Sequence, residues 1–248
     1  MRTPFAMSRV FALSGVVRHT ESMTTRRERL RAATISDIKH AALDQIAAAG
    51  APSLSLRGVA RAIGMSPAGL YRYYDGRDDL LTDLITDAYN ELAAEVEAAI
   101  ATAGETPRAR FKAGIGAYRR WSVDNPNQFL LIFGTPIPGY QAPEDGPTVA
   151  ANRRMGEAFF NVAVEAWRGG GLRLRRTSRR PTGGEAGFAG VIDTGLPPTL
   201  IGVMLGTWAQ FHGLVSLEVL GQLDWMYGND IGIFFDYEVE RLLDDVGL

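Results

Sequence analysis

The sequence predicts an all-α protein, in which a small three-helix domain precedes a larger helical domain. Apolar residues recur at helical spacing along most of the chain, and no segment alternates in the manner of a strand. Breaks rich in Gly and Pro divide this pattern into separate helices. Residues 24–74 hold eight Lys or Arg against three acidic residues, although the whole chain has a net charge of −2. This asymmetry indicates a basic head on a near-neutral body.

Three helices are expected in the head. The first ends at Gly50, which Pro52 follows, an order typical of helix ends. Ser55 is the expected N-cap of the second helix. Ser66 caps the third, which Pro67 opens because its fixed backbone angle suits the first helical turn. The three helices are expected at residues 33–49, 56–63 and 67–74.

The body is expected to begin with a long amphipathic helix. Its helices are expected at residues 78–101, 107–123, 126–133, 149–167, 199–223 and 230–246. An arginine-rich, poorly patterned stretch at 169–198 is expected to be a flexible loop. The predicted division is therefore a disordered tail at 1–23, a head at 24–77 and a body at 78–248.

Composition excludes several kinds of site. The absence of cysteine removes disulfides and thiol chemistry, and it fits a reducing cytoplasm. The three histidines are far apart in sequence, so we expect no metal and no other cofactor. Residues 10–17 are faintly similar to a secretory signal, but Arg9 and Ser14 interrupt the apolar run, and a disordered tail is preferred. No run of about 18 apolar residues is present, so a cytoplasmic protein without a membrane partner is expected.

A helix-turn-helix pattern occupies residues 55–74. In such a motif the second helix enters the major groove of double-stranded DNA, and its first residues face the base edges. Ala68 and Gly69 are small enough for close approach, and Arg72 and Tyr73 continue the same helix face. Arg72 is a suitable donor to a guanine edge or to a phosphate.

Phosphate contacts are expected around this motif. Free backbone N–H groups at the two helix starts, beside Ser55 and Ser66, suit an anion. Arg57 and the basic run at residues 26–31, which includes Arg31, suit phosphates because cations there release condensed counterions. A merely solvated position is an open alternative for each of these arginines.

These residues resemble the signature of the TetR family of regulators. The signature combines a Val-Ala pair, a Gly-hydrophobe-Ser turn, Leu-Tyr, an aromatic pair, a basic residue and an acidic-Leu pair. The matching elements are Val59-Ala60, Gly64-Met65-Ser66, Leu70-Tyr71, Tyr73-Tyr74, Arg77 and Asp79-Leu80. The resemblance implies that Tyr71, Tyr73 and Arg77 contact phosphates and that residues 66–73, Pro67 included, read the groove.

Two departures from the signature are visible. Arg77 stands where lysine is usual, which keeps the charge and changes the geometry. Gly58 replaces a commonly acidic or polar residue, so no capping box with Ser55 is possible. Tyr74 is expected to be a core residue despite its place in the aromatic pair.

The second half of the chain resembles one TetR subclass. Trp208, His212 and Gly213 match its Trp-x-x-x-His-Gly segment, and residues 133–140 are similar to a second segment. The resemblance implies a domain that binds a small-molecule effector and forms a homodimer. Aromatic and Met side chains on central helices are candidates for an apolar pocket, although any helical core holds such residues. The candidates are Trp121, Phe129, Phe133, Phe160, Trp167, Met204, Trp208, Phe211 and His212.

The last two helices are expected to supply the dimer interface, as the family implies. The expected interface residues are Leu214, Leu217, Val219, Leu220, Ile233, Phe234 and Leu242. The implied function is a DNA-binding repressor that a small apolar or aromatic ligand releases from a palindromic operator.

Two alternatives are weighed against that function. The first is a ligand-insensitive regulator or an activator of the same fold. The second is a helical enzyme that uses paired acids such as Asp78/Asp79 or Asp244/Asp245. Adjacent acids on a helix point in different directions and make poor acid–base pairs, so we expect no catalytic residues.

Overall fold

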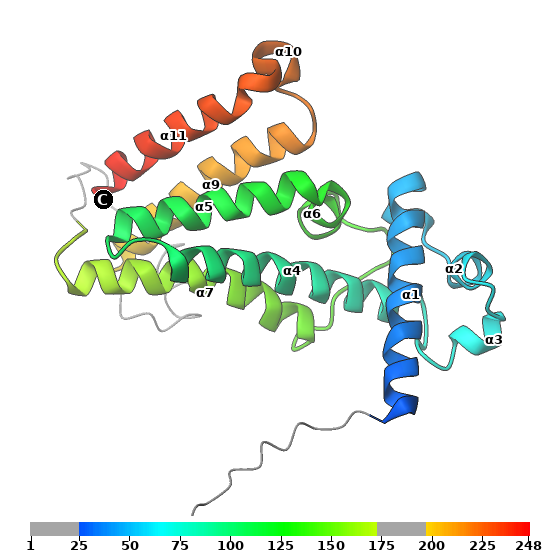
Figure 1. Ribbon diagram of the computed structural model, residues 1–248. Coiled ribbons are helices and arrows are strands. Elements are labelled where there is room, and N and C mark those ends of the chain that lie inside the picture. The colour runs from blue at the N-terminus through cyan, green and yellow to red at the C-terminus, as the bar shows by residue number, and fades with distance from the viewer. Residues whose placement is uncertain (1–24, 173–196) are drawn as a thin grey trace, which may run out of the picture.

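Helices make up all the regular structure of the described residues. The computed structural model describes residues 25–172 and 197–248 (Figure 1). In chain order the elements are α1 (Arg26–Ala49), η1 (Ala51–Ser53), α2 (Leu56–Ala62), α3 (Pro67–Leu70), α4 (Arg77–Thr102), α5 (Pro107–Asp124), α6 (Pro126–Phe133), α7 (Pro147–Arg168), α9 (Pro198–Val219), α10 (Asp224–Tyr227), η2 (Gly228–Asp230) and α11 (Ile231–Val246). The predicted all-α fold is confirmed. The predicted tail at 1–23 and most of the predicted 169–198 loop, residues 173–196, lie outside the described residues.

The first helix is longer than the sequence analysis predicts. Thr25 and Glu28 form a capping box, in which Thr25 Oγ1 accepts from the Glu28 N–H at 3.2 Å and Glu28 Oε2 accepts from the Thr25 N–H at 2.6 Å. α1 therefore begins at Arg26 rather than at Ala33. The basic run is therefore part of the first turns of α1, so the helix sets the spacing of its arginines.

The third helix is shorter than predicted. α3 ends at Leu70, and the Tyr73 N–H then bonds the Leu70 carbonyl at 2.8 Å, a tighter i→i+3 turn. This turn places Tyr74 in the head core, where it is 5% exposed and its hydroxyl donates to Asp83 at 2.6 Å. The core position predicted for Tyr74 is confirmed. Gly64, with a φ of +67°, makes the turn between α2 and α3.

The body is layered around α4. In Figure 1, α4 lies with α5 and α7 along its length, while α9 and α11 form an outer pair. The largest fully buried side chains of the body include Leu92 on α4, Tyr118 on α5, Phe129 on α6, Ile201 on α9 and Leu242 on α11. The predicted helix at 199–223 ends earlier, at Val219, and the short α10 precedes α11.

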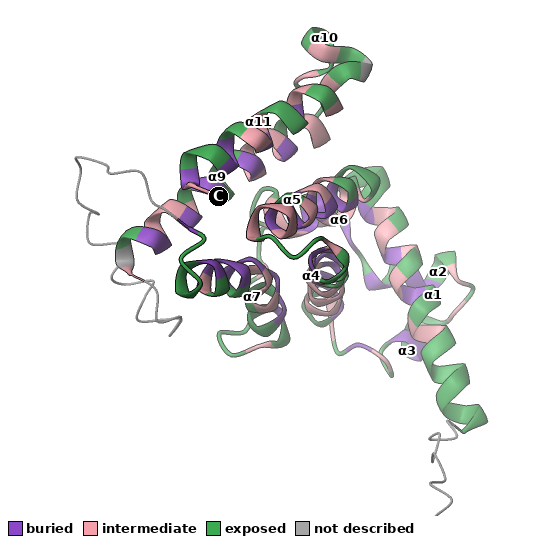
Figure 2. Ribbon diagram, turned by 60° about the vertical axis from the view of Figure 1, so that its left-hand side comes forward, coloured by how far each residue is buried: buried purple, intermediate pink, exposed green. Residues whose placement is uncertain are grey.

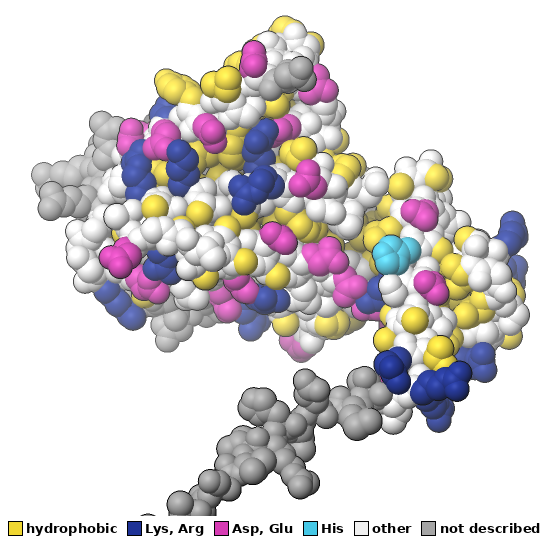
Figure 3. Space-filling model, viewed as in Figure 1, with side chains coloured by type: hydrophobic (Ala, Val, Ile, Leu, Met, Phe, Trp, Pro, Cys, Tyr) yellow, Lys and Arg dark blue, Asp and Glu magenta, His cyan; other side chains and the backbone are white. Residues whose placement is uncertain are grey.

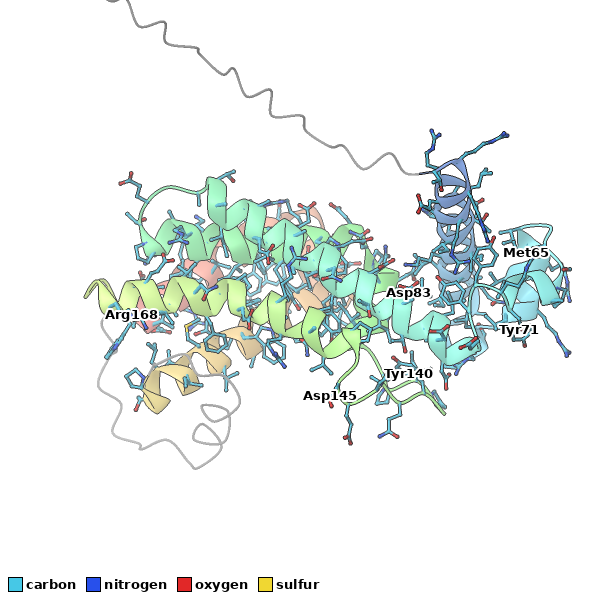
Figure 4. All side chains as sticks on the ribbon, turned by 90° about the horizontal axis from the view of Figure 1, so that it is seen from below. Met65, Tyr71, Asp83, Tyr140, Asp145 and Arg168 are labelled. Atoms are coloured by element: carbon cyan, nitrogen blue, oxygen red, sulfur yellow. The ribbon has the colours of Figure 1, made fainter. Side chains whose placement is uncertain are left out.

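α6 and the loop after it connect the two domains. Leu131 is buried in the head core, Phe129 is buried in the body core, and Ile132 packs against both. Tyr140, from the loop at residues 134–146, packs on the head core and lies 3.0 Å from the Thr82 hydroxyl on α4 (Figure 4). A change in the position of α6 therefore reaches the head directly.

A polar network fixes α1 on α4. Lys39 Nζ lies 2.9 Å from Asp83 and 2.6 Å from Asp87. Burial acts to lower the pKa of Lys39, but its hydrogen bonds with the two carboxylates outweigh burial and raise that pKa above 10.5. Asp83 also accepts from Tyr74, so one carboxylate joins α1, the turn after α3 and α4.

One helix has the length and apolarity of a membrane span, within the part of the chain that the structure describes. This segment is Thr199–Val219, with a mean hydropathy of 1.4. In the fold it packs against α5 and α11, and its residues Phe211 and Val215 are buried in the body core.

Gly114→Ala is expected to destabilise the protein by about 1–3 kcal/mol, because α5 packs too closely for a methyl group at this position. A Cβ there would lie 2.9 Å from Phe159 and 3.0 Å from Ile100. Gly116 is the matched control on the same helix, since a Cβ there meets only the end of the Arg120 side chain, at 3.3 Å. Thermal unfolding of both variants checks this. A stability loss in Gly116→Ala equal to that in Gly114→Ala would contradict the packing argument.

Candidate DNA-binding surface and ligand cavity

The outer face of the head presents the start of α3. Ser66 caps the helix, with its Oγ accepting from the Gly69 N–H at 3.1 Å. Pro67, Ala68 and Tyr71 are exposed, and Tyr71 lies on the side of the head away from the body (Figure 4). The predicted role of Gly69 in close approach to DNA is not supported by its position. Gly69 is buried, and a Cβ there would lie 3.0 Å from the Met65 side chain, so it allows close packing within the head.

A basic patch adjoins this face. Arg26, Arg27, Arg31, Arg72 and Tyr73 line one depression between the start of α1 and the end of the α3 turn. The Arg31 guanidinium lies 4.9 Å from the centre of the Tyr73 ring, a cation–π contact that orders both side chains. Figure 3 shows dark blue side chains gathered at this end of α1.

The arginines of the head and body differ in their partners. Across residues 25–172 and 197–248, the exposed head arginines make no ion pair. These are Arg26, Arg27, Arg29, Arg31, Arg57, Arg61 and Arg72. Several body arginines are ion-paired, namely Arg108, Arg110, Arg119, Arg154 and Arg241. The head therefore carries uncompensated positive charge, which an anionic polymer would neutralise.

Two predicted phosphate-binding residues are already engaged within the head. Arg77 is half-buried, donates to the Ala51 carbonyl at 3.2 Å and lies 3.4 Å from Asp78, so it joins α4 to η1. Ser55 accepts from the Gly58 N–H at a long 3.4 Å, which fits the missing capping box. Gln45, which the sequence analysis missed, accepts from the Ser55 N–H at 2.9 Å and braces this turn.

An apolar cavity of about 320 Å³ lies between α5, α7 and α9. Four predicted ligand-binding residues line it: Phe160, Met204, Trp208 and Phe211. The sequence analysis missed the other lining residues, which are Phe111, Ile115, Val149, Asn152, Arg153, Met155, Gly156, Phe159, Leu205 and Thr207. The volume falls at the lower end of the range of small-molecule pockets, about 300–1,000 Å³.

The other predicted ligand-binding residues lie elsewhere. An aromatic cluster beside the cavity contains Phe129, Phe133 and His212. The ring centre of His212 lies 4.9 Å from that of Trp208, which stacks on it, and 4.8 Å from that of Phe133, which is edge-on to it. Trp121 is a core residue outside the cavity lining, and Trp167 is 38% exposed near the end of α7. None of these five residues lines this cavity, so their ligand contacts stay predictions.

His212 is a neutral, hydrogen-bonded member of this cluster. Its Nδ1 lies 2.7 Å from the Tyr118 hydroxyl, and burial raises the pKa of Tyr118, so this phenol is the donor. The Ser216 hydroxyl donates to the His212 carbonyl at 2.8 Å and lies 3.4 Å from Nε2. These partners favour the tautomer with its proton on Nε2.

Acidification is expected to lower the free energy of unfolding more in the wild-type protein than in the His212→Gln variant. Burial lowers the pKa of His212 below its ordinary 6.5, so the unfolded chain binds this proton more tightly than the folded chain. This contribution to stability is present above pH 6.5 and is lost as the pH falls through the folded pKa. Urea unfolding of both proteins at pH 7, 6 and 5 measures the difference. Parallel pH profiles would show that His212 does not titrate as described.

An apolar surface remains open on the outer pair of helices. Leu220, Trp225, Ile233 and Tyr237 are between 53% and 80% exposed, and Figure 2 shows exposed residues along the outer side of α11. Of the predicted interface residues, Leu217, Leu220 and Ile233 are exposed here. The prediction that Leu242 lies in the interface is wrong, because this side chain is 1% exposed inside the body core. Leu214 and Val219 are part-buried against that core.

The fold and its basic head define a helical DNA-binding protein of the helix-turn-helix class. Residues 38–84 match the family model "Bacterial regulatory proteins, tetR family", and residues 111–242 match "Tetracyclin repressor-like, C-terminal domain". The HTH-type transcriptional regulator Rv1816 of Mycobacterium tuberculosis is 35% identical over 203 residues, which cover 78% of this chain and 84% of that protein. The chain belongs to the TetR family of transcriptional regulators.

Solved structures agree with this assignment. The regulatory protein SCO4313 superposes with a TM-score of 0.71 and 36% identity, covering 89% of this chain and all of that one. FadR of Bacillus subtilis, crystallised with stearoyl-CoA, has a TM-score of 0.56 and 15% identity over 85% of this chain and 98% of its own, and shares the fold. The family and its curated relatives are DNA-binding regulators rather than enzymes, as the sequence predicts. The Trp-His-Gly subclass stays a prediction.

Proposed function

We propose that this protein is a homodimeric repressor, and that a small apolar or aromatic ligand releases it from a palindromic operator. The observation that carries the proposal is the chain of aromatic contacts from the cavity to α6, whose Leu131 is buried in the head core. We keep the division into a DNA-binding head at 24–77 and a ligand-binding, dimerising body at 78–248, with α6 as the body element that reaches the head.

In this proposal the start of α3 enters the major groove. Pro67, Ala68, Tyr71 and Arg72 face the base edges and the nearest phosphates, and Ser66 offers the helix start to a phosphate. Arg57 on α2 and the arginines of residues 26–31 contact the flanking backbone. Arg77 contributes chiefly by holding α4 against η1, because its guanidinium already serves the Ala51 carbonyl.

The open apolar surface of α9, α10 and α11 supports dimerisation. A monomer gains little from exposing Trp225, Ile233 and Tyr237 together, and a two-fold partner would cover them. Two heads related by that axis would enter successive major grooves about 34–36 Å apart. This spacing is the reason to expect a palindromic operator.

Ligand release would operate through a two-state arrangement of α6. A ligand against Trp208 changes its stacking on His212, which itself packs against Phe133 at the end of α6. Moving α6 displaces Leu131 within the head core and alters the separation of the two heads. A coupling free energy of about 1–3 kcal/mol is sufficient for a several-fold to hundredfold loss of operator affinity.

The experiment that tests this function is a selection of genomic DNA fragments with the purified protein. We expect a palindromic site whose affinity falls steeply as salt rises, because phosphate contacts release counterions. Small molecules are then screened for release of the recovered site. A flat salt response would reject the head surface described above. A salt-dependent site that no cavity ligand releases would reject ligand control and favour the ligand-insensitive alternative.

A further inference from the structure

The rim of the cavity carries one uncompensated charge. Most of the lining is apolar, and its polar side chains are Asn152, Arg153 and Thr207. The Thr207 hydroxyl is already used, because it donates to the Val203 carbonyl at 2.9 Å. Within the described ranges, Arg153 and Asn152 make no side-chain hydrogen bond or ion pair. Their donors are therefore available to a molecule in the cavity.

The next residue shows that this freedom is specific to one face of α7. Arg154 points to α4, where it binds Glu97 at 2.5 and 2.8 Å and Asn90 at 3.3 Å. Arg153 has Glu157 one turn further along α7, but the two form no ion pair, and none of the described residues that line the cavity is acidic. Among the residues that the structure describes, the cation at the rim is thus matched by no anion.

We propose that the cavity binds an amphipathic carboxylate, with its chain among Phe111, Phe159 and Phe211 and its carboxylate on Arg153 and Asn152. The inference rests on the proposed function, in which this cavity is the effector site. An arginine fork binds a carboxylate through two parallel hydrogen bonds, and an amide N–H adds a third. At about 30 Å³ for each water-sized group, the cavity holds on the order of ten such groups. A chain of about eight to ten carbons fits that space.

Calorimetric titration of the full-length protein with three ten-carbon probes tests the proposal. The probes are decanoate, 1-decanol and decylammonium, each used below its aggregation concentration. We expect decanoate to bind about tenfold more tightly than decanol. This ratio corresponds to the lower end of the range for a hydrogen bond to a charged group, because water screens the exposed Arg153. Decylammonium is expected to bind most weakly, since it places a cation beside Arg153.

Two variants separate the carboxylate from the cavity. Arg153→Gln is expected to lose the preference for decanoate while keeping its affinity for decanol. Arg168→Gln removes the same charge from the far end of α7 (Figure 4), outside the cavity lining, and is expected to behave like the wild type. Gly156→Leu is expected to abolish binding of all three probes. Gly156 lines the cavity and a Cβ there meets no atom within 4 Å, so a leucine side chain would occupy space that the probes need.

The outcomes distinguish this inference from the proposed function. Equal affinity for decanoate and decanol, or a preference that survives Arg153→Gln, would overturn the carboxylate assignment and leave the cavity as an apolar ligand site. Binding that persists in Gly156→Leu would place the probes elsewhere and overturn both. A decanoate preference that is lost in Arg153→Gln and retained in Arg168→Gln supports the inference.

Discussion

Ile233→Glu is expected to convert the proposed homodimer into a monomer and to reduce operator affinity by about a hundredfold or more. Ile233 is 72% exposed on α11, so the change costs a folded monomer little. In a two-fold dimer the same side chain occurs once in each subunit, and two buried, unpaired carboxylates would face the interface. Two linked heads bind about 10²–10⁴-fold more tightly than one, so loss of the dimer removes that gain.

Light scattering after size exclusion and fluorescence anisotropy with labelled operator measure the two effects. Val123→Glu is the matched control, because Val123 is a 39% exposed apolar residue at the end of α5 and is not among the residues of the open surface of α9, α10 and α11. It is expected to stay dimeric and to keep its operator affinity. If Ile233→Glu remained a dimer with full affinity, the open surface of α9, α10 and α11 would not be the interface.

The body helices could be predicted closely because their starts carry local signals. Pro107, Pro126 and Pro147 each open a helix, and the amphipathic period between them is regular. The predicted start of α1 at residue 33 is too late, because residues 26–31 are charged and show no apolar period. The signal that could have located its start is the spacing of Thr25 and Glu28, a capping box legible in the sequence.

The end of α3 depends on tertiary contacts. Local propensity does not oppose a helix through Tyr74, but the buried ring and its bond to Asp83 hold the chain in a tighter turn. The position of Gly69 was likewise not predictable from local sequence. Its small size predicts that another group packs closely against it, but does not indicate whether that group is DNA or the Met65 side chain.

The ligand cavity was only partly predictable for a related reason. Residue type on the central helices predicts Phe160, Met204, Trp208 and Phe211 as lining residues, but it equally predicts Trp121, which is a core residue outside the lining. Periodicity shows that a helix has an apolar face and does not show where two such faces fail to meet. Arg153 and Arg154 are identical in type and adjacent in sequence, and only the packing of α7 on α4 separates the free cation from the paired one.

Arg72→Ala is expected to lower operator affinity by about ten- to hundredfold for each head, since one bidentate contact to a base is worth about 1–3 kcal/mol. Arg72 is exposed, so its removal is expected to leave the fold and the proposed dimer unchanged. The salt dependence of the residual binding identifies the contact. A guanine contact leaves the slope unchanged, whereas a phosphate contact reduces it by about one unit for each head.

Tyr73→Ala is expected to act through its neighbour. The Arg31 guanidinium lies over the Tyr73 ring, 4.9 Å from its centre. Removal of the ring therefore allows Arg31 to sample many rotamers, which is expected to weaken operator binding. Tyr73→Phe keeps the ring and loses only the hydroxyl. It is expected to retain most of the affinity if the ring orders Arg31, and to match Tyr73→Ala if the hydroxyl itself contacts a phosphate. Operator titrations of these variants, with the dimer verified by light scattering, decide between the two roles. Wild-type affinity in both Arg72→Ala and Tyr73→Ala would show that DNA approaches a different face of the head.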